Sequence, residues 1–338
     1  MKTLVCTRPG RFEYVTAEPP ALKCGQAIIK IKRIGICGTD MHAFEGRLPY
    51  FEYPRILGHE LSGKLVAVDD APGFEIGEAV TFIPYFCCGQ CIACRIGKQN
   101  ACVNIKVCGV HQDGGMVEYI SVPSYCLIHG EGLSYDALAL AEPLAIGAHR
   151  VRRAEITKDE FVLVIGAGPI GLGTMEFARI AGGKVIALDI NNERLKFCKE
   201  RLNVEHAINA MDDDVVQQLK TITNGDMPTV VIEATGNLKA IKNAFHYLVH
   251  RARYVLIRLQ KGENCFGHAE FHKRETTLMN SRYATRRDFE YVIACMNRKE
   301  IDPTTYITHR VLFDQVRDEF ERWLNPWNGV IKAMVEMA

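Results

Sequence analysis

Four cysteines lie close together in the first third of the chain, at Cys88, Cys91, Cys94 and Cys102. Thiolates at this spacing can surround one tetrahedral ion with every ligand local, which is the pattern of a closed, structural zinc site. Without a metal, the thiols of such a loop would be exposed and prone to oxidation, and the loop would have no apolar core. Cys87 could in principle replace Cys88, but the register against the other three thiols favours Cys88.

A glycine-rich turn in the middle of the chain could bind a nucleotide. It follows the apolar run 161–165, which reads as a buried strand, and precedes a helix-like segment. Backbone N–H groups of such a turn, together with the helix N-terminus, bind a pyrophosphate. We therefore predict a dinucleotide site at Gly166, Gly168, Ile170 and Gly171.

Asp189 ends the next apolar run, about 20 residues further on. A carboxylate there accepts hydrogen bonds from an adenosine ribose and repels a 2′-phosphate, which favours NAD over NADP. The alternative for Asp189 is an ordinary turn residue at the end of a strand. Arg194 could cover the adenine or could be a solvated helix residue, and the sequence leaves both open.

Two different residue patterns along the sequence indicate the secondary-structure elements that position these residues. From Phe12 to about Val122, short β-type runs are punctuated by glycine and proline, which indicates a compact, mostly β domain. From about Asp159, apolar strands alternate with helix-length segments, as in a doubly wound parallel sheet. Further predicted strands are 27–32, 61–68, 185–188, 230–232 and 254–259, and two amphipathic stretches, 286–298 and 313–324, precede a terminal apolar run at 330–335.

Composition limits the partners that the protein can have. The chain has 338 residues, and 41 lysines and arginines nearly balance 40 aspartates and glutamates. No field of one sign is therefore available to bind nucleic acid or an anionic membrane, which leaves a small-molecule substrate. No signal peptide or membrane span is evident, and thirteen cysteines without a disulfide pattern suit a reducing compartment, so we expect a cytoplasmic protein.

Several motifs occur together in an order that resembles the zinc-containing medium-chain alcohol and polyol dehydrogenases. They are Gly35-Ile-Cys37-Gly-Thr39-Asp40-Met-His42, Gly58-His59-Glu60, the four cysteines, Glu142-Pro143-Leu144 and the glycine turn. The resemblance covers essentially the whole chain. It implies an α/β protein with a GroES-like, mostly β catalytic domain in 1–145 carrying the cysteine lobe at 87–103, a Rossmann NAD-binding domain in 146–283, and a C-terminal return to the catalytic domain in 284–338.

The resemblance also implies a catalytic zinc, held by Cys37, His59 and a carboxylate that is either Glu60 or Glu142. Taken alone, a histidine–glutamate pair is more often solvated or satisfied in the core. Zinc acts as a Lewis acid that lowers the pKa of a bound hydroxyl, so that hydride can pass to a nicotinamide. The family implies that the proton leaves through Thr39, the cofactor ribose and His42, although His42 could instead be structural. The expected cofactors are thus NAD and two zinc ions, one catalytic and one structural.

Three stretches look most like the bacterial branch of the family that oxidises hexonates such as L-galactonate or L-gulonate; they are 110–115, 270–273 and 275–277. The carboxylate of a hexonate suits the bidentate fork of an arginine, and Arg282 is the candidate, with a surface arginine as the alternative. At Arg258 the family usually has glycine beside the nicotinamide. Its side chain could crowd the cofactor, turn to solvent or reach an anionic substrate.

Two other functions stay open from the sequence. One is a dehydrogenase acting on a neutral polyol such as sorbitol or galactitol, or on L-threonine. The other is a zinc-stabilised nucleotide-binding protein without turnover, and Arg258 is the only residue in the sequence that suggests it. The resemblance further implies a homo-oligomer, either a dimer or a tetramer.

Overall fold

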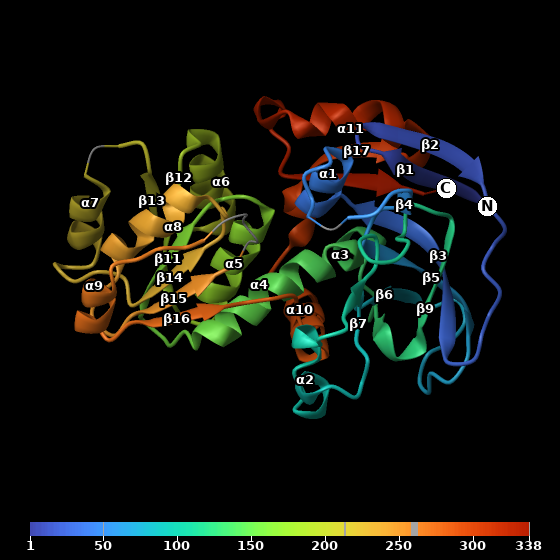
Figure 1. The fold of residues 1–338 in the computed structure, drawn as a ribbon, viewed down its shortest axis with the longest axis horizontal. Coiled ribbons are helices and arrows are strands. Elements are labelled where there is room, and N and C mark those ends of the chain that lie inside the picture. Colours follow the sequence, from blue (N-terminus) through green and yellow to red (C-terminus); the bar gives the residue numbers. More distant parts are fainter. Residues whose placement is uncertain (50, 213, 258–262, 338) are drawn as a thin grey trace. The chain divides into compact units, whose positions relative to one another are not determined.

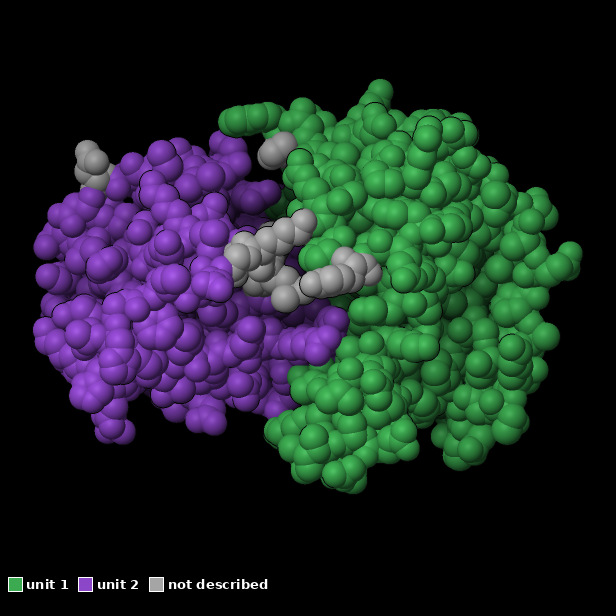
Figure 2. All heavy atoms as spheres, viewed as in Figure 1, with its two compact units in different colours: residues 1–142, 285–338 green, residues 143–284 purple. Residues whose placement is uncertain are grey.

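The computed structural model describes residues 1–49, 51–212, 214–257 and 263–337. The chain divides into two compact units, which Figure 2 shows in different colours. Unit 1 comprises Met1–Glu142 and Thr285–Ala338, and unit 2 comprises Pro143–Ala284. Unit 1 is thus assembled from the two ends of the chain, and each unit is described by itself.

Unit 1 is built around a seven-stranded sheet in which β3 is the central strand (Figure 1). The apolar runs at 27–32 and 61–68 form its two longest strands, which pair antiparallel. The strand order is β10 (Leu127–His129), β6 (Ala79–Phe82), β5 (Glu60–Val68), β3 (Gln26–Gly35), β18 (Lys332–Glu336) and β17 (Ile307–Leu312), and β9 (Tyr119–Pro123) also pairs with β3.

Two small sheets and several short helices complete unit 1. The sheets are β2 (Arg11–Thr16), β1 (Lys2–Arg8) and β4 (Arg55–Ile56), and β7 (Tyr85–Phe86) with β8 (Lys106–Val107). The helices are α1 (Gly38–Phe44), α2 (Ile92–Arg95), α3 (Tyr135–Ala139), α10 (Arg286–Asn297) and α11 (Val316–Leu324). Short 3₁₀ turns lie at Gln99–Ala101, Ser124–Cys126, Pro303–Tyr306, Phe313–Gln315 and Pro326–Asn328.

The C-terminal part of the chain is an integral part of unit 1. The predicted terminal apolar run becomes β18, which pairs antiparallel with β3 so that Met334 lies opposite Gly35. Phe320 on α11 packs against the rings of Phe12 and Phe44, with ring centroids 4.9 and 5.1 Å away. Burial of these aromatic side chains therefore joins the first and last segments of the sequence in one core.

Unit 2 is a six-stranded sheet whose neighbouring strands are all parallel. Counted within the unit, the strands run 3-2-1-4-5-6, which is the order of the Rossmann fold. They are β13 (His206–Asn209), β12 (Lys184–Asp189), β11 (Phe161–Ile165), β14 (Val230–Glu233), β15 (Arg253–Leu256) and β16 (Thr277–Asn280). The predicted parallel sheet is confirmed.

Helices connect the parallel strands of unit 2, as crossover connections must. They are α5 (Pro169–Ile180), α6 (Asn192–Leu202), α7 (Val215–Ile222), α8 (Leu238–Ala244) and α9 (His268–Lys273), with a 3₁₀ turn at Phe245–Tyr247; α4 (Ala141–Ala154) begins at the boundary between the units. The strand predicted at 254–259 ends earlier, at Leu256, and positions 258 and 259 lie outside the described residues. No helix among the described residues is long and apolar enough to span a membrane.

Candidate active site and metal centres

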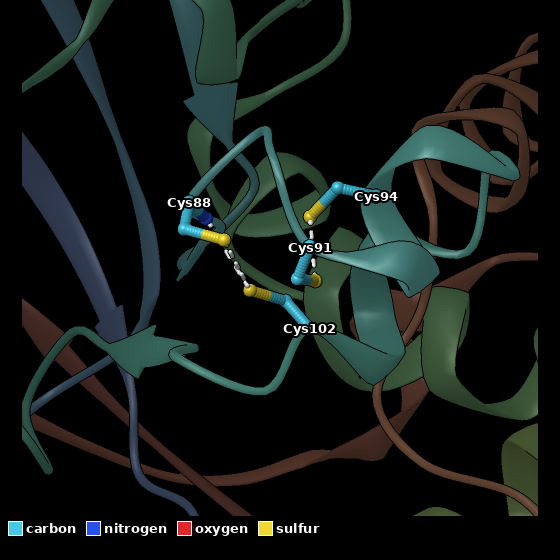
Figure 3. Close-up of side chains that lie close together, drawn as sticks. All are labelled: Cys88, Cys91, Cys94 and Cys102. Atoms are coloured by element: carbon cyan, nitrogen blue, oxygen red, sulfur yellow. Dashed lines mark hydrogen bonds between the residues drawn. The ribbon is translucent and has the colours of Figure 1, made fainter.

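The four predicted lobe cysteines converge in unit 1, as Figure 3 shows. Their sulfur atoms all lie within 4.8 Å of one another. The Sγ atoms of Cys91 and Cys94 are 3.5 Å apart, as are those of Cys88 and Cys102. Cys91 caps the short helix α2, whose single turn places Cys94 beside it. Cys87 is outside this group of sulfur atoms.

The lobe already favours thiolates at some of these positions. Backbone N–H groups of Val103 and Cys94 donate to Cys91 and lower its pKa to about 6. Backbone N–H groups likewise lower the pKa of Cys88, whereas burial raises that of Cys94 to about 12. A bound zinc ion would supply the positive charge that keeps all four thiols deprotonated, so the donor set fits a closed zinc site.

The surface of the lobe supports a structural role for its metal. Ile92, Ile96 and Val103 are 59, 61 and 70% exposed, so the lobe's own apolar side chains are largely in solvent. Hydrophobic burial therefore contributes little to holding this segment together. Coordination of a metal by the four cysteines would stabilise the lobe in place of a hydrophobic core.

A second group of metal-ligating side chains forms where β3 and β5 meet, also in unit 1. Cys37 caps the helix that follows β3, and His59 and Glu60 stand at the start of β5. One ligand atom from each of these three residues lies within 4.8 Å of the others. Gly58 makes the approach possible, because its φ of +95° is a conformation that side chains disfavour.

Asp40 ties the segments that carry Cys37 and His59 together, a role that the sequence did not reveal. Its buried carboxylate accepts hydrogen bonds from the backbone N–H groups of Cys37, at 2.9 Å, and Gly58, at 3.1 Å. The same carboxylate lies 3.7 Å from Nδ1 of His59. This distance is too long for a hydrogen bond, so Asp40 acts on the His59 ring through its negative charge.

The electrostatics of His59 suit a metal ligand. Burial opposes its charged form, but the carboxylate of Asp40 and the neighbouring Cys37 raise its pKa well above the usual value. A metal that binds here must therefore displace a proton from the ring, as metals that bind histidine generally do.

Glu60 has a partner that the sequence did not reveal either. Nζ of Lys332, on β18, lies 2.7 and 2.6 Å from the two carboxylate oxygens of Glu60. Both side chains are almost fully buried, with Lys332 3% and Glu60 1% exposed. Burial alone would lower the pKa of Lys332, but the Glu60 carboxylate outweighs it and raises that pKa. The pair is thus a buried ion pair that includes one member of the metal-ligating group.

Glu142, the alternative carboxylate, has a different environment. It lies in the first turn of α4, is buried, and accepts a hydrogen bond from the hydroxyl of Tyr85. Burial raises its pKa to about 7, while His59 lowers it. Among the described residues, the group around Cys37 and His59 contains Glu60 and does not contain Glu142.

The two residues predicted for the proton path lie on α1. Oγ1 of Thr39 is 3.7 Å from Sγ of Cys37, so this hydroxyl is next to a metal-ligating atom. His42 is 40% exposed, with Nδ1 3.6 Å from Glu45. Thr39 is thus beside the metal-ligating group, and the side chain of His42 is partly exposed to solvent.

The predicted nucleotide turn lies in unit 2 between β11 and α5. Gly166 has φ of +101°, and a Cβ on Gly171 would lie 1.8 Å from the carbonyl oxygen of Gly166, so the turn needs glycine at both positions. Gly168 caps α5, and a Cβ there would meet no atom within 4 Å. Open space at Gly168 and the N-terminus of a twelve-residue helix, on which Ile170 lies half-buried, fit a pyrophosphate.

Asp189 lies at the end of β12, beside this turn. Its carboxylate accepts hydrogen bonds from the backbone N–H groups of Ala167, at 2.6 Å, and Asn191, at 2.9 Å. Arg194 is half-buried in the first turn of α6, where its N–H donates to Asn191. The turn and the carboxylate that would select NAD are therefore next to each other.

The two arginines considered for the substrate lie on unit 2 or outside the described residues. Arg282 is exposed, and its guanidinium lies 4.7 Å from the ring of Tyr283. It belongs to unit 2, whereas the metal-ligating groups belong to unit 1. Arg258 lies outside the described residues.

Comparison with known families agrees with this fold. The alcohol dehydrogenase GroES-like domain matches residues 23–131, and the zinc-binding dehydrogenase family matches residues 169–298. L-galactonate-5-dehydrogenase of Escherichia coli K12 is 42% identical over 99% of this chain and 98% of that protein. The chain therefore belongs to the zinc-binding alcohol dehydrogenases.

Two further relatives show the range of the family. Sorbitol dehydrogenase of Halalkalibacterium halodurans is 33% identical over 91% of this chain and 92% of that one. An alcohol dehydrogenase of Escherichia coli CFT073, solved with NADH, is 30% identical over 99% of both chains, with a TM-score of 0.92. The predicted family, its fold class and the class of enzyme, a zinc-type dehydrogenase, are confirmed.

Proposed function

We propose that this protein is an NAD-dependent dehydrogenase that oxidises a secondary hydroxyl group of a hexonate, such as L-galactonate or L-gulonate, to the keto acid. The observation that carries the proposal is the 42% identity to an L-galactonate-5-dehydrogenase along nearly the whole length of both chains. The converging Cys37, His59 and Glu60 supply the matching chemistry.

In this proposal Cys37 and His59 hold the catalytic zinc together with one of two carboxylates, Glu60 or Glu142. Glu60 has a carboxylate oxygen within 4.8 Å of the ligand atoms of Cys37 and His59, and Glu142 is close enough to His59 to interact with its charge. Zinc, when bound, supplies Lewis-acid activation of the substrate hydroxyl. Asp40 holds the backbone N–H groups of Cys37 and of Gly58, the residue before His59, and Tyr85 donates a hydrogen bond to the carboxyl group of Glu142. The four lobe cysteines hold a second, structural zinc.

Thr39 takes the proton of the substrate hydroxyl, and His42 exchanges it with solvent. The ribose of NAD, when bound, would connect the two. Thr39 can accept a proton and pass one on, because a hydroxyl both donates and accepts. The exposure of His42 supports its position at the solvent end. Thr39→Val, which lacks the hydroxyl, should interrupt this path, whereas Thr39→Ser should preserve it.

NAD binds at Gly166, Gly168, Ile170 and Gly171 in this proposal, with Asp189 on the adenosine ribose and Arg194 beside the adenine. The carboxylate of Asp189 supports NAD over NADP because it would repel a 2′-phosphate. In a test, Asp189→Ser should raise kcat/KM for NADP relative to NAD by at least about tenfold. An unchanged ratio would overturn this assignment.

Arg282 is proposed to bind the carboxylate of the hexonate. A guanidinium forms two parallel hydrogen bonds to a carboxylate, which a lysine cannot reproduce. Arg282→Lys should therefore raise KM for a hexonate and leave KM for NAD unchanged. Arg287→Lys, a nearby exposed position, is the matched control.

A substrate screen tests the proposed function. NADH formation is followed with L-galactonate, L-gulonate, sorbitol, galactitol and L-threonine at equal concentrations. We expect the highest kcat/KM with a hexonate. Preference for sorbitol would support the second candidate, a polyol dehydrogenase, which the 33% identical sorbitol dehydrogenase favours. No turnover with any of the five, with zinc and NAD bound, would favour a binding protein.

We further propose that the protein is cytoplasmic, acts in carbohydrate metabolism and forms a dimer or a tetramer. Thirteen cysteines, all unpaired by disulfides in the structure, support a reducing compartment. The outer strand β16 of the parallel sheet has an unpaired edge among the described residues, which is a surface where two copies can join. Sedimentation equilibrium measures the assembly directly.

A further inference from the structure

The buried ion pair between Lys332 and Glu60 joins two segments separated by 272 positions in the sequence. Nζ of Lys332 contacts both carboxylate oxygens, and it also donates to the carbonyl oxygen of Ile36, at 3.1 Å. The lysine thus contacts the chain immediately before Cys37 as well as the carboxylate of Glu60. It is linked to two of the three residues of the metal-ligating group.

Gly35 provides the space in which this pair forms. On the central strand β3, Gly35 pairs with Glu60 of β5 on one side and with Met334 of β18 on the other. Side chains alternate along a strand, so Lys332 shares a face with Met334. A Cβ on Gly35 would lie 2.3 Å from Oε2 of Glu60. The missing side chain therefore lets Lys332 reach across β3 to the carboxylate.

The same carboxylate has two competing partners. An oxygen atom of Glu60 lies within 4.8 Å of the ligand atoms of Cys37 and His59, yet both of its oxygens already contact an ammonium group. A zinc ion and an ammonium group repel each other strongly when both are a few ångströms from one buried carboxylate. Glu60 can therefore bind one of them closely only by weakening its contact with the other.

We propose that Lys332 is a positioning residue that competes with the catalytic zinc for Glu60. Glu142 then completes the ligand set with Cys37 and His59, and Glu60 does not permanently fill the coordination position that the substrate needs. Catalytic zinc sites function because one position stays open to water or substrate. A purely structural ion pair would have no such effect on the metal. The inference rests on the proposed zinc ligands and is independent of which alcohol is oxidised.

Metal retention provides a test that does not depend on turnover. The zinc-loaded wild type and the Lys332→Met variant are dialysed against increasing concentrations of a chelator, and the remaining zinc is counted. Without the competing cation, Glu60 binds the metal more tightly, so the chelator concentration that removes the catalytic zinc should rise at least about tenfold. Turnover should fall at least about tenfold, since Glu60 now occupies the open position.

Two controls separate this effect from general damage. Lys64→Met makes the same chemical change at an exposed position of β5, the strand that carries Glu60, and should leave both measurements unchanged. The lobe zinc is an internal control, because it shares no ligand with the group around Glu60. Its release should follow the same chelator curve in every variant.

A double variant tests whether Lys332 acts through Glu60. In a Glu60→Gln background there is no carboxylate for the loss of Lys332 to free. Adding Lys332→Met should therefore not increase zinc retention. If Lys332→Met does not fold, Lys332→Gln replaces it, since the amide keeps a hydrogen-bond donor for Glu60 without the charge. Lys332→Arg keeps the charge and should retain zinc as the wild type does.

The proposal is overturned if the catalytic zinc of the uncharged variants is lost at the same or a lower chelator concentration than in the wild type. Such a result would leave Lys332 with a structural role alone. Because zinc retention is measured without substrate, this failure can be told apart from a failure of the hexonate screen.

Discussion

The two groups of metal-ligating residues in unit 1 differ in how the chain assembles them. The lobe takes its four sulfur ligands from a single short segment, 88–102. The other group, called the reactive group below, consists of Cys37, which follows β3, and of His59 and Glu60 at the start of β5. Glu60 is paired with Lys332, from the far end of the sequence. A local set of ligands can close around a metal by itself, whereas a distant set is held in place by the sheet.

The surroundings of the two groups differ as much as their origins. Ionisable side chains besides Cys37, His59 and Glu60 lie around the reactive group, including Asp40, Glu142 and Lys332, and all three are buried. The lobe is instead bordered by exposed apolar residues. Buried charges that shift one another's pKa values are typical of sites that do chemistry. The difference supports a catalytic role for one group and a structural role for the other.

The largest expected effect is on turnover, when a ligand of the reactive group is changed. Cys37→Ser should lower kcat/KM by at least about a thousandfold, because several kcal/mol of Lewis-acid stabilisation are lost. The thermal midpoint should change little, since the sheet holds the surrounding strands. Cys24→Ser, at an exposed cysteine of the same unit, is the control and should keep full activity. Activity retained in Cys37→Ser would remove the reactive group from the mechanism.

The lobe should respond in the opposite way. Cys94→Ser removes a ligand on which the segment depends, and loss of a metal is among the changes that cost about 4 kcal/mol or more. The thermal midpoint should fall by roughly 10 °C, as scanning calorimetry would measure. Turnover per folded molecule should fall far less than in Cys37→Ser. A stable Cys94→Ser protein would contradict a structural role for the lobe.

The sequence predicted the features that depend on neighbouring residues. Spacing within a single loop was enough to predict the cysteine cluster from Cys88 to Cys102 and the glycine turn from Gly166 to Gly171. In the structure the four sulfur atoms of the lobe converge, and the glycine turn directly precedes a helix. The roles of Lys332 and Tyr85 were missed. Lys332 interrupts an apolar run with no local sign of a partner, and Tyr85 meets Glu142 only because two segments 57 positions apart fold against each other. Such contacts are set by tertiary structure.

A smaller effect is expected from adding a single methyl group to β3. Gly35→Ala places a Cβ where Glu60 now lies, so the carboxylate must move or the strands must separate. Overpacking of this kind costs about 1–3 kcal/mol. We expect the free energy of unfolding in urea to fall by that amount, together with a measurable loss of turnover. Gly267→Ala, at a glycine with no atom within 4 Å of the added Cβ, should change neither.

The smallest effect concerns pH. Burial raises the pKa of Glu142 from 4.5 to about 7 in the folded, metal-free chain. A carboxyl group with a raised pKa contributes stability that is present below about pH 4.5 and is lost as the pH rises through about 7. Unfolding of the chelator-treated protein in urea should therefore need less urea at pH 7 than at pH 4.5. Glu142→Gln should weaken this dependence.

Asp136 provides the control for the pH experiment. Burial raises its pKa, but hydrogen bonds from Arg310 and Arg33 outweigh burial and lower it below the usual value. Its contribution to stability is thus present above about pH 3.8 and is lost only at lower pH. Asp136→Asn should leave the slope between pH 4.5 and 7 unchanged. An equal slope in Glu142→Gln and the wild type would show that another group causes it.

The zinc content of three purified proteins tests the central claim, that one chain holds two zinc ions with different roles. Atomic absorption should give two zinc ions per chain for the wild type and one each for Cys37→Ser and Cys94→Ser. The single zinc in Cys94→Ser should support turnover, whereas that in Cys37→Ser should not. Two zinc ions in Cys94→Ser, or only one in the wild type, would contradict the account.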